Sequence, residues 1–585
     1  MLKTLFKQTK GVRLISVLTP LCMIGEVIME MIVPRLMSSI IDDGVTAGNM
    51  QHIYTIGGWM ILAAIVGLVF GVGGAVFGSA AATGLARNLR KSMFANIQTF
   101  SFANIDKYST AGLVTRMTTD VTNIQNAYQM SLRMSIRAPA SLIVAMVMSF
   151  AINRQLASIY LAAAILLACV LVFIMSHATR YFDQAFHRYD DLNESVQENV
   201  SAIRVVKAYV REKFEGEKFR KASEALRSLF MRAELILSWN SPAMMLTVYS
   251  CILLISWFGA RMIISSGATA FTTGELMSML AYCMNILMSL MMLSMVFVMI
   301  SMSAASAHRV AEVLDEKSDL HDPEEPVMEV KNGAVEFDHV CFRYKKDGRD
   351  VLSDINLNIR SGETIGIIGG TGSAKSSLVQ LLPRLYDVSA GHVRIGGIDV
   401  RNYDLDVLRN SVAMVLQKNE LFSGTIAENL RWGNEHATQE ELEEACRQAC
   451  ADEFIERFPD KYETHIEQGG TNVSGGQKQR LCIARALLKK PKILILDDST
   501  SAVDTATDAK IRKSFADKIP GTTVFIIAQR ISSVENADHV LVLDGGKISG
   551  YGTPAEMLAT NKIYQEVYNS QKQGGGDFDE KGGEA

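Results

Sequence analysis

Four long stretches in the first half of the chain contain no Asp, Glu, Lys or Arg. They are residues 53–86, 155–179, 235–260 and 276–308. A helix needs about 20 largely apolar residues to cross a bilayer, so each stretch can span a membrane. Two weaker stretches, 14–41 and 128–152, carry a few charged residues. The pattern predicts a membrane domain with six spanning helices.

The connections between these spans differ in length and in basic residues. The first, third and fifth are short and hold few Lys or Arg, whereas the second and fourth are long and rich in both. Because Lys and Arg concentrate in cytoplasmic loops, the second and fourth connections and both chain ends are predicted to be cytoplasmic. The short basic start has no cleavage site, so we expect a multi-pass protein of the plasma membrane.

The two long connections keep apolar residues at helical spacing. The membrane helices are therefore expected to continue well beyond the bilayer. Each helix pair reverses at a short polar segment, at residues 104–108 and 210–213. A reversal at the tip of such a stalk would offer a knob to a neighbouring domain.

Two sets of residues within the spans are candidates for contact with a transported compound. Glu26 and Glu30 share a helix face, either as a cation-attracting site or as a pair bonded to a neighbouring helix or close to the interface. At spacings of three or four residues the sixth span carries a row of methionines: Met284, Met288, Met291, Met295, Met299 and Met302. Their flexible thioethers suit a wall for varied apolar compounds, or they only pack helices together.

The second half of the chain, after a Pro-bounded acidic linker, alternates strand-like and helical patterns. Residues 363–368 predict a buried strand, and a Gly-rich turn and a helical run follow it. The turn consists of Gly369, Gly370, Thr371, Gly372, Ser373, Ala374, Lys375, Ser376 and Ser377. Its backbone N–H groups would cradle phosphates, Lys375 would reach the β- and γ-phosphates, and Ser376 would hold Mg²⁺. The strict pattern has Gly where this chain has Ala374.

Two further motifs accompany this cradle. Residues 493–497 predict a buried strand ending in Asp497, an acid suited to Mg²⁺. Just upstream lies the stretch Ser474, Gly475, Gly476 and Gln477. The whole set resembles the ATP-binding cassette family, of which Ser-Gly-Gly-Gln is the most specific mark. The resemblance covers nearly the whole chain and implies a half-size exporter, with an α-helical six-span membrane domain followed by an α/β P-loop ATPase domain.

The resemblance implies roles for other residues and for two ligands, ATP and Mg²⁺. Tyr344 would stack on adenine, and Gln417 would contact Mg²⁺ and sense the nucleotide. Residues 501–504, which end in Asp504, would form a loop that crosses to a partner cassette. The reversals of the two long connections would be coupling helices seated on the cassettes.

The charge of the chain excludes one class of partner. A net charge of −4 and the lack of a basic stripe argue against a nucleic-acid partner.

The spans and motifs together predict the domain boundaries. We expect a membrane domain at residues 1–310, a linker at 311–334 and a cassette at 335–570. The Gly-rich acidic tail, 571–585, is expected to be disordered.

The sequence departs from the family pattern on one side only. In the family, each of two ATP sites joins the cradle of one cassette to the Ser-Gly-Gly-Gln of the other. A Glu follows the Mg²⁺ aspartate as the base for the attacking water, but this chain has the shorter Asp498. A His positions the γ-phosphate in the family, but this chain has Gln529, which cannot carry a positive charge. Together with Ala374, both changes weaken the site on this chain's own cradle.

This asymmetry resembles one half of the heterodimeric bacterial multidrug exporters. The expected function is ATP-driven efflux of amphipathic compounds across the lipid bilayer. The expected partner is a different half-exporter that carries the catalytic Glu and His, and few disulfide-permissive features indicate a bacterial source. A slower homodimer, a lipid or peptide exporter, and a nucleotide-gated channel or regulatory subunit remain alternatives.

Overall fold

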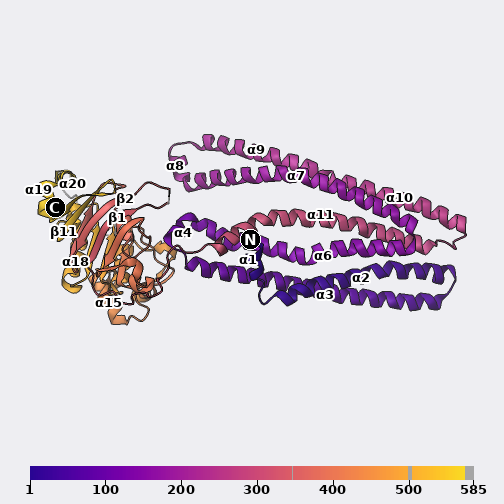
Figure 1. Ribbon diagram of the computed structural model, residues 1–585, viewed down its shortest axis with the longest axis horizontal. Helices are drawn as coiled ribbons and strands as arrows, with labels where there is room; N and C mark the ends of the chain where they lie inside the picture. Colours follow the sequence, from indigo (N-terminus) through magenta and orange to yellow (C-terminus); the bar gives the residue numbers. More distant parts are fainter. Residues whose placement is uncertain (346, 499–502, 574–585) are drawn as a thin grey trace. The chain divides into compact units, whose positions relative to one another are not determined.

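The computed structural model describes residues 1–345, 347–498 and 503–573, and these form two compact units (Figure 1). The membrane unit contains residues 1–98 and 109–316, and the cassette unit contains residues 99–108 and the chain from Lys317 onward. Positions 501 and 502 of the expected crossing loop and residues 574–585 of the expected disordered tail lie outside the described residues. Residues 571–573, which the sequence placed in that tail, are helical.

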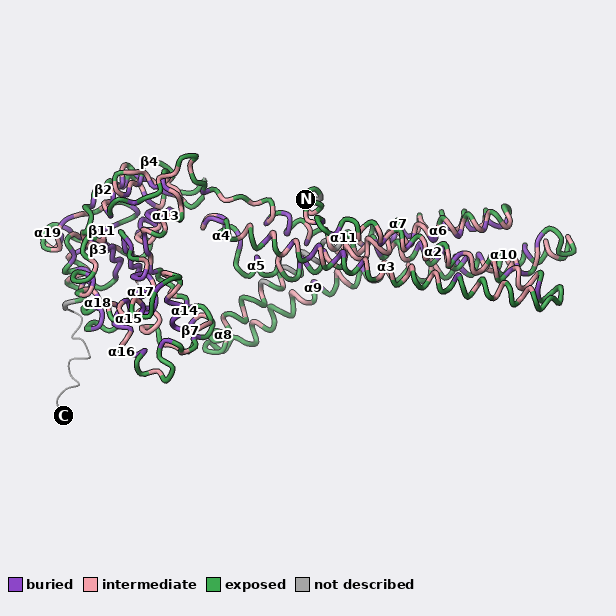
Figure 2. The backbone as a smooth tube through the Cα atoms, turned by 90° about the horizontal axis from the view of Figure 1, so that it is seen from below, coloured by how far each residue is buried: buried purple, intermediate pink, exposed green. Residues whose placement is uncertain are grey.

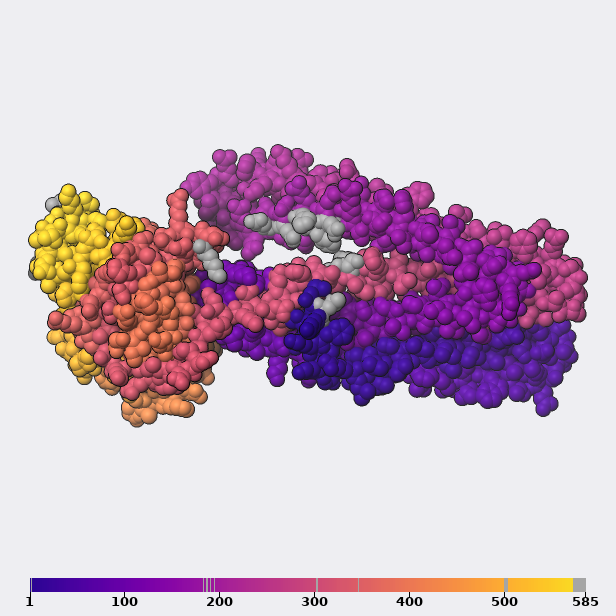
Figure 3. All heavy atoms as spheres, in the orientation of Figure 1, coloured from indigo at the N-terminus to yellow at the C-terminus, as the bar shows by residue number. Residues whose placement is uncertain are grey.

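The membrane unit is helical throughout. Its helices are α1 (Leu2–Lys7), α2 (Arg13–Ser39), α3 (Met50–Gln98), α5 (Thr110–Thr115), α6 (Val121–Ile152), α7 (Arg154–Ser201), α8 (Ile203–Ala208), α9 (Glu212–Ser238), α10 (Asn240–Ser266) and α11 (Thr273–Asp315). Two π-helical turns, Ile40–Thr46 and Arg116–Asp120, continue α2 and precede α6. The N-terminal residues lie on the surface of the bundle (Figure 3), where Asn88 Nδ2 donates to Gln8 O at 2.8 Å.

The prediction of six spans is confirmed. Six helical segments of the described chain are long and apolar enough to cross a membrane: Arg13–Thr46, Met50–Gln98, Thr110–Ile152, Arg154–Phe182, Glu212–Ser266 and Thr273–Asp315. Helix α2 lies beside α3, α6 beside α11, and α7 beside α9 (Figure 1). Much of each long helix is exposed or half-buried in the single chain (Figure 2), as expected for surfaces that face lipid or a second subunit.

Buried tyrosines join helices inside the membrane unit. Tyr160 of α7 donates its hydroxyl hydrogen to Met279 O of α11 at 2.7 Å. Tyr282 of α11 donates in the same way to Met31 O of α2 at 2.8 Å. Both rings are fully buried among apolar side chains of α2, α6, α7, α10 and α11. These bonds satisfy the only polar atom of each side chain, so the tyrosines fix helix positions without a buried unpaired group.

Both predicted reversals of the long connections are present. The first is the short helix α4 (Phe102–Lys107), whose N-cap Ser101 and Asn104 form a capping box. The second follows α8, where Val210 takes a left-handed conformation with φ of 53° before α9 begins. The first reversal belongs to the cassette unit although both flanking helices belong to the membrane unit.

The cassette unit combines strands and helices. Its strands are β1 (Val335–Phe342), β2 (Leu352–Ile359), β3 (Thr364–Ile368), β4 (Ala390–Ile395), β5 (Ile398–Asp399), β6 (Val412–Val415), β7 (Gly424–Thr425), β8 (His465–Ile466), β9 (Ile493–Asp497), β10 (Thr523–Ile527), β11 (His539–Asp544) and β12 (Lys547–Gly552). Besides α4, its helices are α12 (Lys375–Gln380), α13 (Leu405–Ser411), α14 (Ile426–Arg431), α15 (Gln439–Gln448), α16 (Asp452–Ile455), α17 (Gly475–Leu487), α18 (Thr505–Lys518), α19 (Pro554–Thr560) and α20 (Lys562–Gln573).

Two sheets and a layer of helices enclose two hydrophobic cores. The larger sheet has the order β12-β11-β3-β10-β9-β6, with all neighbours parallel except the edge strand β12. The smaller sheet has the order β2-β1-β4-β5 and is antiparallel. Along β10, Phe525 and Ile527 face the core between the sheets, whereas Val524 and Ile526 face the helices. Burial on both faces explains why these strands are continuous apolar runs.

Candidate functional site

The predicted nucleotide residues follow four neighbouring strands. Strands β3, β10, β9 and β6 are adjacent and parallel, so their carboxyl ends meet at one edge of the sheet. The cradle follows β3, Gln529 follows β10, Asp497 ends β9, and Gln417 lies two residues after β6. Sheet topology therefore gathers residues that lie more than a hundred positions apart in the chain.

The cradle turns sharply between β3 and α12. A Cβ atom on Gly369 would lie 2.2 Å from Leu543 O, so only glycine fits there. Ala374 takes a left-handed conformation with φ of 68°, directly before the first residue of α12. Such a conformation costs a non-glycine residue about 1–2 kcal/mol. This cost gives a physical reason for the Gly that the family has at this position.

Lys375 lies at the start of α12 with its ammonium group turned onto the cradle. Its Nζ atom donates to Gly369 O at 2.8 Å and to Gly370 O at 2.9 Å. Partial burial lowers the pKa of Lys375, while Asp497 and Asp498 oppose that shift. The ammonium is thus held among the backbone groups that would surround phosphates.

Ser376 and Asp497 form a pair suited to Mg²⁺. Ser376 Oγ donates to Asp497 Oδ1 at 3.0 Å, and Asp497 is 4% exposed. Burial raises the pKa of Asp497. A divalent cation would stabilise this buried carboxylate, and a hydroxyl, a carboxylate and the amide oxygen of Gln417 are oxygen ligands that Mg²⁺ prefers. The residues fit the ion, which when bound would neutralise phosphate charge.

Asp498 and Gln529, the two residues that replace the family's Glu and His, contact each other. Gln529 Nε2 donates to Asp498 Oδ2 at 2.9 Å. Burial raises the pKa of Asp498, and hydrogen bonds from Gln417 and Gln529 lower it in part. The backbone of Asp498 is left-handed, with φ of 48°. The Asp498 side chain is one methylene shorter than the Glu of the family pattern.

Tyr344, the predicted adenine partner, lies half-exposed in an aromatic cluster. Its hydroxyl lies 2.8 Å from Ser377 Oγ, next to the cradle. Its ring meets Phe342 and Tyr386 edge-on, at centroid distances of 4.8 and 5.2 Å. The Tyr344 side chain is 46% exposed, so part of it is open to a ligand. Sequence reasoning did not identify Tyr386, because nothing in its local pattern marks it.

Helix α4 reaches this aromatic cluster within the cassette unit. Tyr386 Oη donates to Asp106 Oδ2 at 2.6 Å, and Phe102 meets the Tyr386 ring edge-on at 6.0 Å. Asn104 Nδ2 donates to Lys317 O at 3.1 Å. The polar and aromatic residues of the first reversal therefore pack on the same tyrosine that supports Tyr344.

The Ser-Gly-Gly-Gln stretch begins helix α17. Ser474 is the N-cap, its Oγ accepts from Gln477 N at 3.3 Å, and Ser474 N donates to Gln477 Oε1 at 2.9 Å. Both residues are on the surface of the unit, and α17 is 13 residues long. Among the described residues, no hydrogen bond or ion pair joins this stretch to the cradle. Its N–H groups and the helix dipole point outward, where an anion can approach.

Asp504, the described end of the expected crossing loop, is the N-cap of α18. It accepts a hydrogen bond from Thr507 N at 2.9 Å, and this bond lowers its pKa. The carboxylate is therefore ionised and anchored at the helix start.

Glu26 and Glu30 share one partner in the membrane unit. Arg137 of α6 pairs with Glu26 through Nη1 and with Glu30 through Nη2, the second contact at 2.8 Å. Arg137 therefore bonds the carboxylate pair to a neighbouring helix. Arg137 is one of the charged residues in the weaker stretch 128–152, and no local pattern marks it as this partner. Glu30 stays the more open of the two carboxylates, with 41% of its side chain exposed against 22% for Glu26.

The methionine row lies on an open face of α11. Met284, Met288, Met291 and Met295 are all exposed in the single chain. The opposite face of α11 is buried in the membrane core. Met299 is half-buried, and the side chain of Met302 lies outside the described set. Within one chain a large part of each of these four side chains is thus open.

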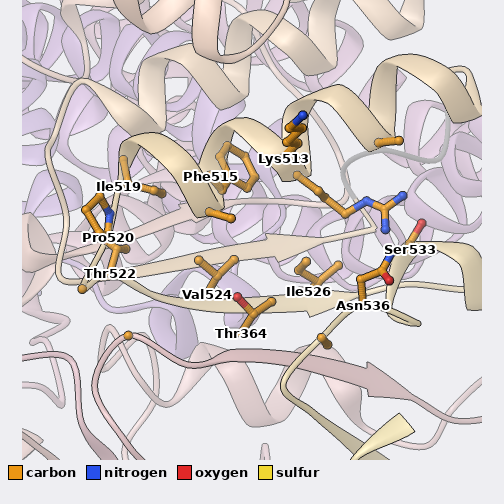
Figure 4. Close-up of a pocket in the computed structure, with 16 residues that line it drawn as sticks. Thr364, Lys513, Phe515, Ile519, Pro520, Thr522, Val524, Ile526, Ser533 and Asn536 are labelled. Carbon is orange, nitrogen blue, oxygen red and sulfur yellow. The ribbon is translucent and has the colours of Figure 1, made fainter. Parts of the chain in front are cut away.

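A pocket of about 330 Å³ lies elsewhere in the cassette unit, between α18 and the sheet. Val524, Ile526, Phe515 and Ile519 form its apolar part, and Lys513 stands at its edge (Figure 4). None of the predicted nucleotide residues lines it. Nucleotide is therefore expected at the strand ends and not in this pocket.

Comparisons with known proteins match both units. Residues 17–291 match the ABC transporter transmembrane region, and residues 352–501 match the ABC transporter family. The "Uncharacterized ABC transporter ATP-binding protein YfiB" of Bacillus subtilis is 35% identical over 562 residues, covering 96% of this chain and 97% of that protein.

Two other relatives carry functional names. The "Probable multidrug resistance ABC transporter ATP-binding/permease protein YheI" of Bacillus subtilis is 32% identical over 93% of each chain. The "ATP-dependent lipid A-core flippase" of Desulfotalea psychrophila is 32% identical over 83% of this chain and 84% of its own. The structure of a bacterial Atm1-family ABC exporter with ATP bound superposes with a TM-score of 0.79 at 23% identity, covering 97% of this chain and 99% of that chain, which shows a shared fold.

Proposed function

The chain belongs to the ABC transporters as a half-size, ATP-hydrolysing exporter, and from this premise we propose that it works as one half of a heterodimer. In this proposal the partner is a different half-exporter with Glu and His at the positions of Asp498 and Gln529. The pair would move amphipathic compounds out across the plasma membrane. ATP binding and hydrolysis would drive the movement.

The contact between Asp498 and Gln529 carries this proposal. Two departures from the family pattern would be independent if they lay apart, but their side chains are joined at 2.9 Å. They therefore alter one chemical unit, the group that would activate and align the attacking water. A base placed about 1 Å out of reach can lose roughly a hundredfold in rate. A homodimer would carry this weakened unit in both of its sites.

The groups that bind nucleotide are retained on the cradle. Lys375 would pair with the phosphates, Ser376 and Asp497 would hold Mg²⁺, and Tyr344 would stack on the base. None of these contacts depends on the length of the catalytic carboxylate at position 498. We infer that this chain's own site binds ATP and hydrolyses it slowly.

The exposed start of α17 would serve the partner's site. Ser474 and the following N–H groups lie on the surface and, within the described part of the chain, make no hydrogen bond to this chain's cradle. In the dimer they would meet the γ-phosphate bound on the partner's cradle. Donors placed where charge develops in the transition state contribute about 10²–10³ in rate. The chain would thus contribute more to the partner's chemistry than to its own.

The membrane unit supports amphipathic cargo. The four exposed methionines of α11 would offer an adaptable apolar wall, and a relative named for multidrug resistance is consistent with such cargo. Two carboxylates against one Arg137 leave a net negative charge, so Glu30 would favour cationic compounds. The flippase relative makes lipid export the second candidate.

Cargo preference tests the role of the carboxylates. Replacing Glu26, Glu30 and Arg137 together with Gln removes the charge without leaving an unpaired arginine. We expect transport of cationic amphipaths to fall about threefold and transport of neutral ones to change little. Vesicle uptake of a matched cationic and neutral pair measures this, and equal losses would assign the cluster to folding alone.

The deciding experiment compares the chain alone with a mixed dimer. The chain is purified by itself and together with a half-exporter carrying Glu and His, and both are reconstituted in vesicles. ATP turnover and compound export should be low for the chain alone and high for the pair. Brisk, cooperative ATP turnover by the chain alone would refute the heterodimer. Stimulation by lipids and not by drug-like amphipaths would favour lipid export.

A further inference from the structure

The segment that follows β10 is held by the last described helix of the chain. Gln571 of α20 makes two hydrogen bonds to it: Nε2 donates to Gln529 O at 2.7 Å, and Oε1 accepts from Ile531 N at 2.8 Å. Between these two groups, Arg530 has an extended backbone, with φ of −95° and ψ of 129°. The side-chain amide thus pairs with an extended residue as a neighbouring strand would.

Helix α20 is a firm base for this contact. Tyr564 is 1% exposed, and Ile563 and Val567 pack against the hydrophobic core on the helix side of the sheet. Asn561, just before the helix, caps Tyr564 N at 3.0 Å. Gln571 therefore projects from an anchored helix, although its own side chain lies at the surface.

The same segment is held separately at its far end. Arg512 Nη1 donates to Ser532 O at 2.6 Å, and Ser533 Oγ donates to Asp508 Oδ2 at 3.0 Å. Ser533 and Asn536 also line the pocket between α18 and the sheet (Figure 4). Residues 529–531 do not line that pocket, so α18 holds the far end and α20 holds the end next to the nucleotide site.

We propose that Gln571 is a positioning residue for the nucleotide site on this chain. It fixes the backbone of Gln529, and the Gln529 side chain in turn holds Asp498 at 2.9 Å. Of the twenty side chains, a glutamine at this reach supplies both the donor and the acceptor that the segment needs. The C-terminal helix thereby acts on the residue that would face the γ-phosphate. The inference rests on the proposed ATP binding at this cradle.

Two variants of Gln571 in the full chain, with one control variant, test the two hydrogen bonds. Gln571→Leu removes both, and Gln571→Glu keeps the acceptor for Ile531 N but loses the donor to Gln529 O. Asn569→Leu, at an exposed position two residues earlier on the same helix, is the matched control. Each chain is photolabelled with radioactive 8-azido-ATP after different chase times with unlabelled ATP, with and without the partner subunit.

We expect both Gln571 variants to release nucleotide about threefold to tenfold faster than wild type, and Asn569→Leu to match wild type. In a Gln529→Ala background, Gln571→Leu should add nothing, because its effect passes through the Gln529 side chain. Unchanged release in both Gln571 variants would overturn the assignment. Additive effects in the Gln529→Ala background would also overturn it, since they would mean a general structural role.

The failure of the two proposals can be told apart. If wild-type chain retains no label, ATP binding at this cradle is wrong, whatever Gln571 does. If wild type retains label and the Gln571 variants retain it equally well, the nucleotide site stands and the positioning role is wrong.

Discussion

The two nucleotide-facing regions of the cassette are built differently. At the cradle, Asp498 and Gln529 bond to each other and Gln417 bonds to Asp498, so the polar side chains are engaged within the chain. At the start of α17, the side chains of Ser474 and Gln477 each bond to the other residue's backbone, and Ser474 is exposed. The side chains beside the cradle thus bond to one another, whereas the start of α17 is exposed and can contact a second molecule.

In the proposed heterodimer, this difference would let one chain lose chemistry at its own site and still serve the partner's site. The residues proposed for cleavage follow β9 and β10, whereas the residues proposed to serve a neighbour lie at the N-cap of a helix. Because the two sets share no residue and no hydrogen bond among the described residues, a change in one leaves the other intact. Four variants test this separation, from the largest expected effect to the smallest.

Ser474→Arg should nearly abolish ATP turnover of the mixed dimer. It removes a donor to the γ-phosphate and adds bulk and charge, so we expect a loss of about 10²–10³. The matched control is Thr438→Arg, because Thr438 is also an exposed N-cap with a capping box, on α15. Both changes cost a cap worth about 1 kcal/mol, but only the first should stop turnover. Equal loss in both would mean that Ser474 acts through folding.

Asp498→Glu combined with Gln529→His should restore hydrolysis at this chain's own site. The longer carboxylate regains its reach and the imidazole can carry charge, so ATP turnover of the chain without partner should rise about 10- to 100-fold. Steady-state phosphate release measures the change. If a correctly folded double variant showed no gain in ATP turnover, the cause of slow hydrolysis would lie outside these two residues.

Asp498→Asn should lower turnover of the mixed dimer only a few-fold. The carboxylate is already a poorly placed base, so its loss removes little from a rate set at the partner's site. The same assay as for Ser474→Arg serves here. If Asp498→Asn were as inactive as Ser474→Arg, both sites would hydrolyse equally and the comparison would fail.

Ala374→Gly should have the smallest effect. It removes the conformational cost of an alanine in the left-handed region. The free energy of unfolding should therefore rise by about 1 kcal/mol, while ATP turnover changes less than twofold. Ala268→Gly is the control, because Ala268 also has a positive φ, 61°, but lies in the membrane unit. A large rise in turnover from Ala374→Gly alone would make the cradle backbone, and not Asp498, the limiting defect.

Local patterns predicted most of the architecture. The six spans and the two reversals follow from charge-free length and helical spacing, and the strand before the cradle follows from its apolar run. The gathering of Lys375, Asp497 and Gln529 could be expected only through the family resemblance, since strand order is not a local property. The departures at Asp498 and Gln529 were visible in the sequence, but their mutual hydrogen bond was not.

Contacts between distant segments could not be predicted. Glu26 and Arg137 pair across 111 positions. Gln571 holds Gln529 across 42 positions, although the sequence pattern places Gln571 at the start of the tail that is expected to be disordered. Such pairs depend on how helices and strands pack, and neither partner has a spacing that points to the other.

The place of α4 has a consequence for how such proteins can be recombined. Residues 99–108 are covalently part of the stalk but belong physically to the cassette unit, with Asp106 and Asn104 bonded to Tyr386 and Lys317. A chimaera that exchanges cassettes at the linker would replace Tyr386 and leave its acceptor behind in the old stalk. The exchangeable module is therefore discontinuous in the gene, and a functional swap must carry this ten-residue insert together with the segment that begins at Lys317.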